Sequence, residues 1–394
     1  MITRRHFFLS APALAALPAA TAADDACILL TPDQARRMRA KLAPEAADMV
    51  RQNAGAALKA GPWSVTNHRP GYMRTGPNDY YSEGPYWWPD PKNPNGPYIR
   101  KDGQRNPDRF MGNRRDLGDM SAAVLALGMG ACLLGDKRCA EHAAKVLAVW
   151  FVEPRTRMNP NLEFGQAVRG INTGRGTGII DTVSLIHAAQ GVSLLAQDGA
   201  LDRAVADGVR RWFADYLRWM TTSSKGLDEK KATNNHATWW TAQVAAFATL
   251  AGDQAAKTMA WDHYRNYLVP TEVQPDGSCP REEARTNSLG YSTMNLDGFA
   301  VLCRIADSSG VSLWRYRTPR GIGIEKSFSY LMPYVLHPQT WRKQQISPYS
   351  ADGSVFLGLA GVGLHSEELL KAYRALPRSR APWVQFVDLV VRTA

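Results

Sequence analysis

The chain has 394 residues, 45% of them hydrophobic, and a formal net charge of +11. This composition is typical of a globular protein with a large core rather than of a membrane-spanning chain. A basic chain favours an acidic partner, although a generally basic surface would explain the charge equally well. The chain also has twelve tryptophans and fourteen tyrosines, which indicate either an aromatic core or a cleft lined with rings.

The N-terminus has the pattern of an export signal. Arg4 and Arg5 precede a short apolar run that ends in small residues, as in twin-arginine secretory signals. We expect residues 1–22 to be a signal peptide cleaved near Ala22, and residues 23–394 to form one periplasmic or secreted domain. The apolar run is too short to span a membrane stably, and no other stretch is expected to do so. Export makes nucleic acid an unlikely partner and favours an anionic polysaccharide.

Helical patterns dominate the rest of the chain. Thr31 begins one helix, with Pro32 at its first position and Gln34 where a capping box requires it. Apolar periodicity predicts further helices at residues 117–134, 138–150, 180–197, 201–221, 235–251, 255–267, 288–306, 323–334, 351–362, 366–374 and 380–392. Strand-like alternation is scarce, and short turns join the helices. We therefore expect an all-α fold, either a bundle or an α/α toroid of antiparallel helix pairs.

Two long irregular segments interrupt this helical pattern. Residues 62–113 and 153–178 are too long for plain connections, and loops of this length in a compact domain are usually functional.

Cys132 and Cys139 flank a predicted tight turn and could form a local disulfide in an oxidising compartment. The chain has no Cys/His spacing of a zinc site, no phosphate-binding loop and no Ser-His-Asp pattern, so we expect no cofactor and no metal.

Residues 231–240, KATNNHATWW, place polar groups at a predicted helix start. Thr233 or Asn234 can cap the helix, which puts Asn235 and His236 in its first turn. Unsatisfied N–H groups and the positive end of the helix dipole attract a carboxylate there. Alternatively, Asn234 is a plain cap and His236 a structural histidine. The two tryptophans that follow are expected to anchor the helix in the core.

A second helix start has a similar character. Asn287 or Ser288 can cap the helix at 288–306, Tyr291 falls in or near its first turn, and Arg285 lies just upstream. Both helix starts could face one cleft. Taken alone, a buried tyrosine and a solvated arginine explain this segment better.

Together these segments carry a resemblance to a known family. NNHATWW and REEARTNSLGY resemble the active-site segments of the alginate lyase superfamily of helical-toroid polysaccharide lyases. DYYSEGPYWWPDPKNPNGPYIRKDGQRNPD, FGQAVRGINTGRGTGIID and YLMPYVLHPQTWRKQQI resemble its N-terminal signature, central loop and C-terminal segment. The resemblance covers roughly residues 60–350 and is closer to family thirty-eight than to family five. It implies an α/α toroid that cleaves alginate or glucuronan by β-elimination without a metal.

The resemblance also assigns candidate site residues. Asn235 and His236 match the second Asn and the His of the family motif, Tyr291 matches its catalytic tyrosine, and Arg285 matches the nearby arginine. The spacing from Arg285 to Tyr291 is one residue shorter than in family five. Candidate substrate contacts are Asn234, Gln166, Asn172 and Arg175, with Tyr86, Trp87 and Trp88 stacking on sugar rings and Arg100 attracting a carboxylate. The three aromatic residues would equally serve to plug the toroid.

The chemistry of β-elimination fits these side chains. The C5 proton of a uronate is weakly acidic, and neutralising the neighbouring carboxylate makes it removable. Asn235, His236 and Arg285 are suitable donors for that task. In β-D-mannuronate and β-D-glucuronate the C5 proton and O4 lie on one face, so Tyr291 can act as base and then acid, with His236 as an alternative base. We therefore expect a preference for these uronates over α-L-guluronate.

Two other functions stay open. A glycoside hydrolase on a helical toroid would need paired carboxylates. Glu282 and Glu283 are adjacent in the chain, and Asp79, Glu83 and Asp102 lie in the first irregular segment. Adjacent residues rarely project to both sides of one glycosidic bond. A non-catalytic uronate-binding protein would need the arginines and aromatic residues but not Tyr291.

Overall fold

The computed structural model describes residues 28–393, except 74 and 198, and the predicted signal peptide at residues 1–22 lies outside the described residues. The α-helices of the described part are α1 (Pro32–Ala40), α2 (Pro44–Ala57), α3 (Gly112–Leu134), α4 (Lys137–Leu147), α5 (Leu185–Gln197), α6 (Arg203–Thr222), α7 (Ser224–Lys230), α8 (Asn235–Ala251), α9 (Gln254–His263), α10 (Val269–Glu272), α11 (Pro280–Glu283), α12 (Ser288–Ser308), α13 (Glu325–Leu336), α14 (Phe356–Leu364), α15 (Glu367–Ala375) and α16 (Pro382–Thr393). Four short strands accompany them: β1 (Tyr81–Glu83), β2 (Trp87–Trp88), β3 (Ile99–Arg100) and β4 (Phe164–Ala167).

Every helix predicted from apolar periodicity has a counterpart in the structure. The predicted capping box of α1 is also present, since Thr31 accepts from the Gln34 N–H and Gln34 accepts from the Thr31 N–H. The first part of the segment predicted as a helix at 180–197 belongs instead to a 3₁₀ helix, η2 (Gly176–Thr182). The capping signals and the periodicity of these helices are local in sequence, which is why they could be predicted.

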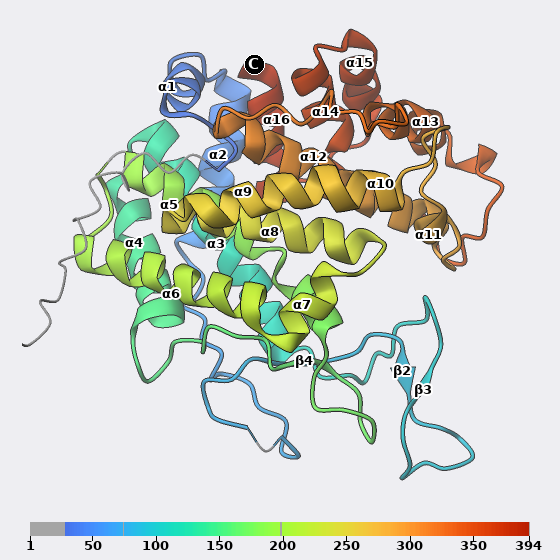
Figure 1. Cartoon of the computed structure of the whole chain (residues 1–394). Helices are drawn as coiled ribbons and strands as arrows, with labels where there is room; N and C mark the ends of the chain where they lie inside the picture. Colours follow the sequence, from blue (N-terminus) through green and yellow to red (C-terminus); the bar gives the residue numbers. More distant parts are fainter. Residues whose placement is uncertain (1–27, 74, 198, 394) are drawn as a thin grey trace, which may run out of the picture.

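The core lies between an inner set of helices, chiefly α3, α5, α8 and α12, and an outer set that includes α6 and α9 (Figure 1). Nearly all of α8 is buried because its side chains are apolar or small on every side. Trp240 is fully buried and Trp239 almost so, which confirms that the two tryptophans anchor this helix. The position of α8 fixes where its polar first turn lies.

Among the described residues, α3 is long and apolar enough to cross a membrane by length and composition alone. The sequence-based expectation that no such stretch exists beyond the N-terminus is therefore wrong. Most of the apolar stretch of α3 is buried inside the protein, where it packs against α2, α4 and α5. Its apolar character is that of a core helix.

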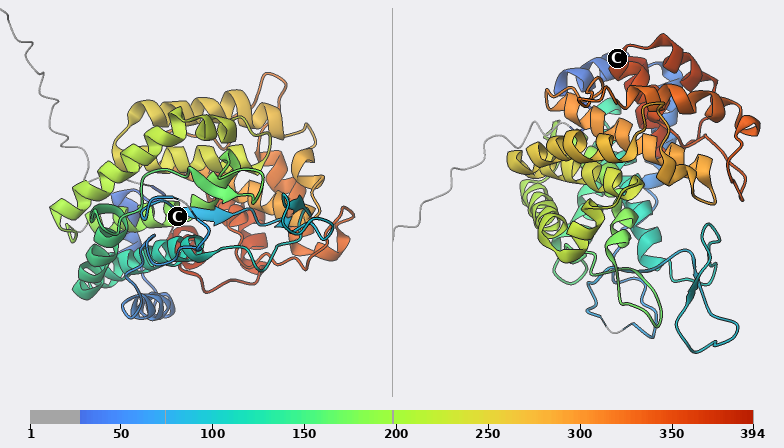
Figure 2. Two further views of the ribbon diagram at one scale, coloured as in Figure 1. Left: turned by 90° about the horizontal axis from the view of Figure 1, so that it is seen from below. Right: turned by 45° about the vertical axis from the view of Figure 1, so that its right-hand side comes forward.

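The two long irregular segments meet on one side of the helices, below them in Figure 1. β1 comes from the first segment and β4 from the second, and they pair in parallel, with Tyr81 opposite Phe164. Figure 2 shows these two strands side by side. β2 and β3 form an antiparallel hairpin in which Trp87 lies opposite Arg100. We call residues 84–106, which contain this hairpin, the aromatic loop.

A buried carboxylate ties the two segments together. Asp181 of η2 accepts hydrogen bonds from Tyr80 Oη (3.2 Å), Ser82 Oγ (2.6 Å) and Gln166 Nε2 (3.0 Å). Arg114 at the start of α3 adds an ion pair, with its Nε 3.3 Å from Asp181 Oδ1. A buried charge that is paired and hydrogen-bonded in this way fixes the relative positions of the elements that supply its partners.

Cys132 and Cys139 are both buried, and no disulfide joins them, so the local disulfide considered from the sequence is not formed. Cys139 packs its sulfur into the space left by Gly130 of α3, where an added Cβ would lie 2.7 Å from Sγ. Burial and the neighbouring Asp136 raise the pKa of Cys139 to about 11. The thiol therefore serves as a small core side chain.

Glu272 of α10 is a buried carboxyl group whose pKa is shifted by its surroundings. Its Oε2 accepts from Thr238 and Asn295 at 3.0 Å each, whereas Oε1 has no hydrogen-bond partner in the described part of the chain. Burial, and then the charge of Glu282, raise the pKa of Glu272 to about 8. A carboxyl pKa raised on folding contributes stability that is complete below the pKa of the unfolded chain and lost as the pH rises through about 8.

Glu272→Gln should therefore stabilise the protein at alkaline pH by roughly 1–3 kcal/mol, with a smaller effect near pH 5. Chemical unfolding of both proteins at pH 5 and pH 9 measures the difference. An exposed carboxylate with the same charge change, Asp262→Asn, is the control. A stability difference that does not depend on pH would show that Glu272 is not a neutral acid in the folded protein.

Candidate active site

A cavity of about 850 Å³ lies between the aromatic loop, the central loop and the starts of α8 and α12. It brings together most of the residues singled out in the sequence: Tyr86, Trp87, Arg100, Gln166, Arg175, Asn234, Asn235, His236, Arg285 and Tyr291. The two predicted helix starts therefore face one cavity, as expected.

Two predicted contact residues do not line this cavity. Trp88 is half-buried, donates its Nε1–H to Gln104 O (2.9 Å) and carries Lys101 over its ring. Asn172 is exposed, and its Oδ1 accepts from the Val168 N–H (3.2 Å). Both side chains make these contacts within their own loops, and their roles as substrate contacts stay predictions.

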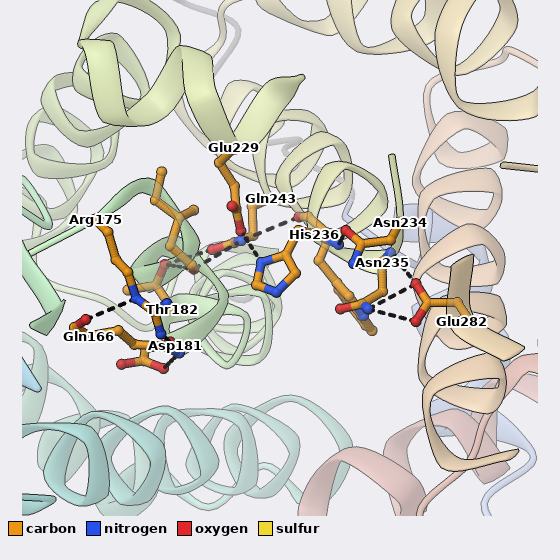
Figure 3. A network of polar contacts seen from close by, with 12 residues as sticks. Gln166, Arg175, Asp181, Thr182, Glu229, Asn234, Asn235, His236, Gln243 and Glu282 are labelled. Carbon is orange, nitrogen blue, oxygen red and sulfur yellow. Dashed lines mark hydrogen bonds and ion pairs between the residues drawn. The ribbon is translucent and has the colours of Figure 1, made fainter. Parts of the chain in front are cut away.

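The first turn of α8 is already occupied by a protein carboxylate. Asn234 is the N-cap, and its side chain accepts from the His236 N–H. The backbone N–H of Asn235 donates to Glu282 of α11, and its Nδ2 lies 2.9 Å from both carboxylate oxygens of Glu282. The helix start binds a carboxyl group, as predicted, but that group belongs to the fully buried Glu282. Figure 3 shows this arrangement.

His236 has a partner that sequence reasoning missed. Its Nδ1 lies 2.5 Å from Oε1 of Glu229, a buried residue near the end of α7. Burial opposes the charged imidazolium, but the charge and the hydrogen bond of Glu229 outweigh it, so the pKa of His236 is raised. Because Nδ1 is bound to Glu229 (Figure 3), Nε2 is the ring nitrogen left for a ligand in the cavity.

Arg285 lies flat against Tyr291, with its guanidinium carbon 3.7 Å from the centre of the tyrosine ring. Asp102 of the aromatic loop holds it there, since Oδ1 accepts from Nη2 at 3.0 Å and Oδ2 from Nε at 3.2 Å. Burial works in the opposite direction, yet the hydrogen bonds and charge of Arg285 lower the pKa of Asp102 to about 2. Arg285 is thus near the phenol, as predicted, but it is already paired with a carboxylate.

Tyr291 also contacts the aromatic loop, because its hydroxyl is hydrogen-bonded to that of Tyr86. Burial and the hydrogen bond with Tyr86 raise the pKa of Tyr291, and the charge of Arg285 lowers it by less. Tyr291 therefore rests as a neutral phenol in this structure. The expectation that a nearby cation makes the tyrosinate accessible is met only in part, since burial outweighs the cation.

The central loop contributes an oriented arginine. Gln166 has a left-handed backbone with φ of 49°, which is unusual for a residue other than glycine. Its backbone oxygen accepts from Arg175 Nε (3.1 Å) and its Oε1 from Arg175 Nη2 (2.9 Å). Arg175 in turn lies over the ring of Trp87. A strained backbone that positions a half-buried cation on a cavity wall is typical of a binding site.

Within the described residues, no group of three or more His, Cys, Asp or Glu side chains is placed to hold a metal ion. The cavity instead offers hydrogen-bond donors, a phenol and an imidazole whose pKa is raised. Such a set can neutralise an anion and transfer a proton.

Comparisons with known proteins agree with this chemistry. Residues 64–341 match the alginate lyase family. Among curated proteins, none matches this chain. A crystal structure of an alginate lyase from Bacteroides ovatus is 32% identical and superimposes with a TM-score of 0.85, covering 92% of this chain and 98% of that chain.

More distant structures share the fold. Alginate lyase A1-III from Sphingomonas species A1 is 17% identical, with a TM-score of 0.56 over 85% of this chain and 94% of that chain. A histidine-to-alanine variant of A1-III complexed with a tetrasaccharide is 16% identical, with a TM-score of 0.59 over 87% of each chain. The predicted α/α toroid is confirmed by this likeness. On the family match and the similarity to the Bacteroides ovatus enzyme, the chain belongs to the alginate lyase family and is a polysaccharide lyase.

Proposed function

We propose that this protein cleaves a 1,4-linked polyuronate by β-elimination, acting on mannuronate stretches of alginate or on β-1,4-glucuronan. The observation that carries the proposal is that Tyr291, His236 and Arg285 line one cavity from the segments that begin α8 and α12. A phenol, an imidazole and a guanidinium supply one proton-transfer group and two donors for a carboxylate. β-Elimination at a uronate needs this combination.

The proposed reaction moves one proton and breaks one bond. Tyr291, as the phenolate, takes the C5 proton, and the electron pair of the C–H bond forms the C4–C5 double bond. The C4–O4 bond breaks, and the departing oxygen takes the proton back from Tyr291. Because the carboxylate gains negative charge while the C5 proton leaves, donors on that carboxylate lower the barrier.

Each proposed role follows from a contact. His236 Nε2 and Arg285 are the proposed donors to the substrate carboxylate. Asn235 is a third donor if one N–H of its side-chain amide leaves Glu282 and binds the sugar. A sugar that takes the place of the Tyr86 hydroxyl at Tyr291 removes one interaction that raises the tyrosine pKa. The cationic Arg285 against the ring then favours the phenolate.

A substrate panel tests the proposal. The protein is incubated with polymannuronate, glucuronan and polyguluronate, and the ultraviolet absorbance of the unsaturated uronate is followed. Absorbance should rise with the first two polymers and rise least with polyguluronate, whose C5 proton and O4 lie on opposite faces. New reducing ends without absorbance would indicate hydrolysis. The absence of both signals with all three polymers would refute the proposal.

The contacts of the candidate carboxylates disfavour a hydrolase. Glu282 is fully buried and bound to Asn235, and Glu283 pairs with Lys343. Neither lines the cavity, whereas a hydrolase needs two carboxyl groups that flank the scissile bond.

His236→Ala should lower kcat by roughly 100- to 1,000-fold, since it removes one donor to the developing charge. It also leaves Glu229 as an unpaired buried carboxylate, so the melting temperature is measured in parallel. The variant His236→Gln keeps a hydrogen-bond donor without the charge, and so separates the effect on catalysis from the effect on stability. An alanine variant that folds normally and retains the wild-type rate would exclude His236 from the reaction.

We also propose that the mature protein is exported as one domain after removal of residues 1–22. The support is the twin-arginine pattern around Arg4 and Arg5. N-terminal sequencing of the protein from a periplasmic fraction tests this, and replacement of both arginines by lysine should abolish export.

A further inference from the structure

The cavity continues beyond Tyr291 along α12. Asp297 follows Tyr291 by six residues, which places it roughly 9 Å further along the helix axis at 1.5 Å per residue. Asp297 lines the same cavity together with Tyr349, Asp352 and Ser354. α14, which begins just after Ser354, lies on the opposite side of α12 from β2 and β3 in Figure 1.

The two regions of the cavity differ in charge. The region around the aromatic and central loops is lined by arginines: Arg100, Arg105, Arg114, Arg175 and Arg285. The cavity-lining residues of α12 after Tyr291 and of residues 345–354 include Asp297 and Asp352 and no arginine or lysine. The nearest cation, Arg378, is directed to Ser354 O (2.7 Å) and to Asp388 Oδ1 (3.2 Å). A polyanion in this cavity therefore meets donors in one region and carboxylates in the other.

Asp297 also has a structural task. Its Oδ1 accepts from Ser354 Oγ (2.9 Å) and from the N–H groups of Val355 (2.8 Å) and Phe356 (2.9 Å), and so caps the start of α14. All three bonds converge on one oxygen, and an amide oxygen would accept them equally well. The cap therefore does not require the charge. Burial raises the pKa of Asp297 to about 6, against the three hydrogen bonds, so the group is charged at neutral pH.

We propose that Asp297 is a specificity-determining residue that binds a sugar through its hydroxyl groups and rejects a carboxylate at that position. The inference rests on the proposed lyase function. A fixed carboxylate is a strong acceptor for sugar hydroxyls, and a second carboxylate brought beside it is repelled. The sugar favoured there is an uncharged unit, such as a carboxyl-esterified uronate or a neutral hexose, and a charged uronate binds there more weakly.

Polymannuronate in which about a third of the carboxyl groups are reduced to neutral mannose units is the probe. The wild-type protein digests it, and mass spectrometry locates the neutral units relative to the unsaturated uronate. We expect neutral units to be enriched at one fixed position beside that uronate. Neutral units distributed as in the starting polymer would overturn the inference, and this measurement needs no variant.

Asp297→Asn keeps the acceptor for α14 and removes the charge. It should abolish the positional enrichment and raise kcat/KM on fully charged polymannuronate on the order of tenfold, because the repulsion is gone. Asp262→Asn, an exposed residue that does not line the cavity, makes the same change in net charge and should leave both readouts unchanged.

The outcomes separate the two proposals. Unsaturated products from the wild-type protein with an unchanged pattern in a folded Asp297→Asn variant would refute the role of Asp297 and leave the lyase function standing. No unsaturated product from any polyuronate would refute the lyase function, and this inference would fall with it.

Discussion

Tyr291→Phe is expected to lower kcat by roughly 100- to 10,000-fold and to leave KM nearly unchanged. The substitution removes the hydroxyl that exchanges a proton with C5 and O4, and this is the usual range for loss of a positioned acid or base. The ring stays against Arg285, so the cavity keeps its shape. The rate of appearance of unsaturated uronate measures the effect.

Tyr86→Phe is the matched control for this prediction. It removes the other partner of the same hydrogen bond but not the reacting hydroxyl, so kcat should fall by less than about tenfold. The substitution also removes a contact that raises the pKa of Tyr291, so the acidic limb of the pH–rate profile should move to lower pH. A Tyr291→Phe variant with near wild-type turnover would show that another group transfers the proton.

Glu229→Gln is expected to lower kcat/KM by roughly 10- to 100-fold and to change its pH dependence. Glutamine can still accept the Nδ1–H of His236 but no longer compensates its charge. The direction of the change follows from two opposing effects on the pKa of His236, since burial lowers this pKa and Glu229 raises it. Without Glu229 the pKa falls, His236 loses its charge at lower pH, and the alkaline limb of the pH–rate profile moves to lower pH.

The control for this prediction carries the same charge change outside the cavity. Glu163 pairs with Lys225 and accepts from Trp219, so Glu163→Gln should leave the alkaline limb in place. If the limb also stays in place for Glu229→Gln, while kcat/KM falls, Glu229 has a structural role only. An unchanged kcat/KM would show that the charge of His236 is not used.

Local sequence accounts for the parts of the fold and site that were predicted. The first turn of α8 follows from Asn234 as a cap and from the apolar run behind it. Helix α2 was missed, and its N-cap residue, Ala43, makes no side-chain cap hydrogen bond that could have marked its start. The predicted helix at 351–362 begins only at Phe356, because the capping carboxylate comes from Asp297 on another helix.

The missed site contacts are long-range or depend on a turn. Asp102 and Arg285 are 183 residues apart, and no sequence pattern links them. Glu229 precedes His236 by only seven residues, but the chain turns between the end of α7 and the start of α8, so helical spacing does not bring them together on one face. Trp88 was expected to stack on a sugar ring like Tyr86 and Trp87, but it does not line the cavity, because alternate residues of a strand face opposite sides.

The ion pair between Asp102 and Arg285 has a consequence for affinity. A uronate that approaches Arg285 competes with Asp102, a carboxylate of the same protein that the aromatic loop holds at a high effective concentration. The apparent dissociation constant of the substrate is then its intrinsic value divided by the fraction of molecules in which Arg285 is released. Short oligosaccharides, which make few other contacts, bear this penalty in full. Under the proposed function, long polymers offset this weaker binding through contacts with the other arginines that line the cavity, so chain length affects affinity before any bond is broken.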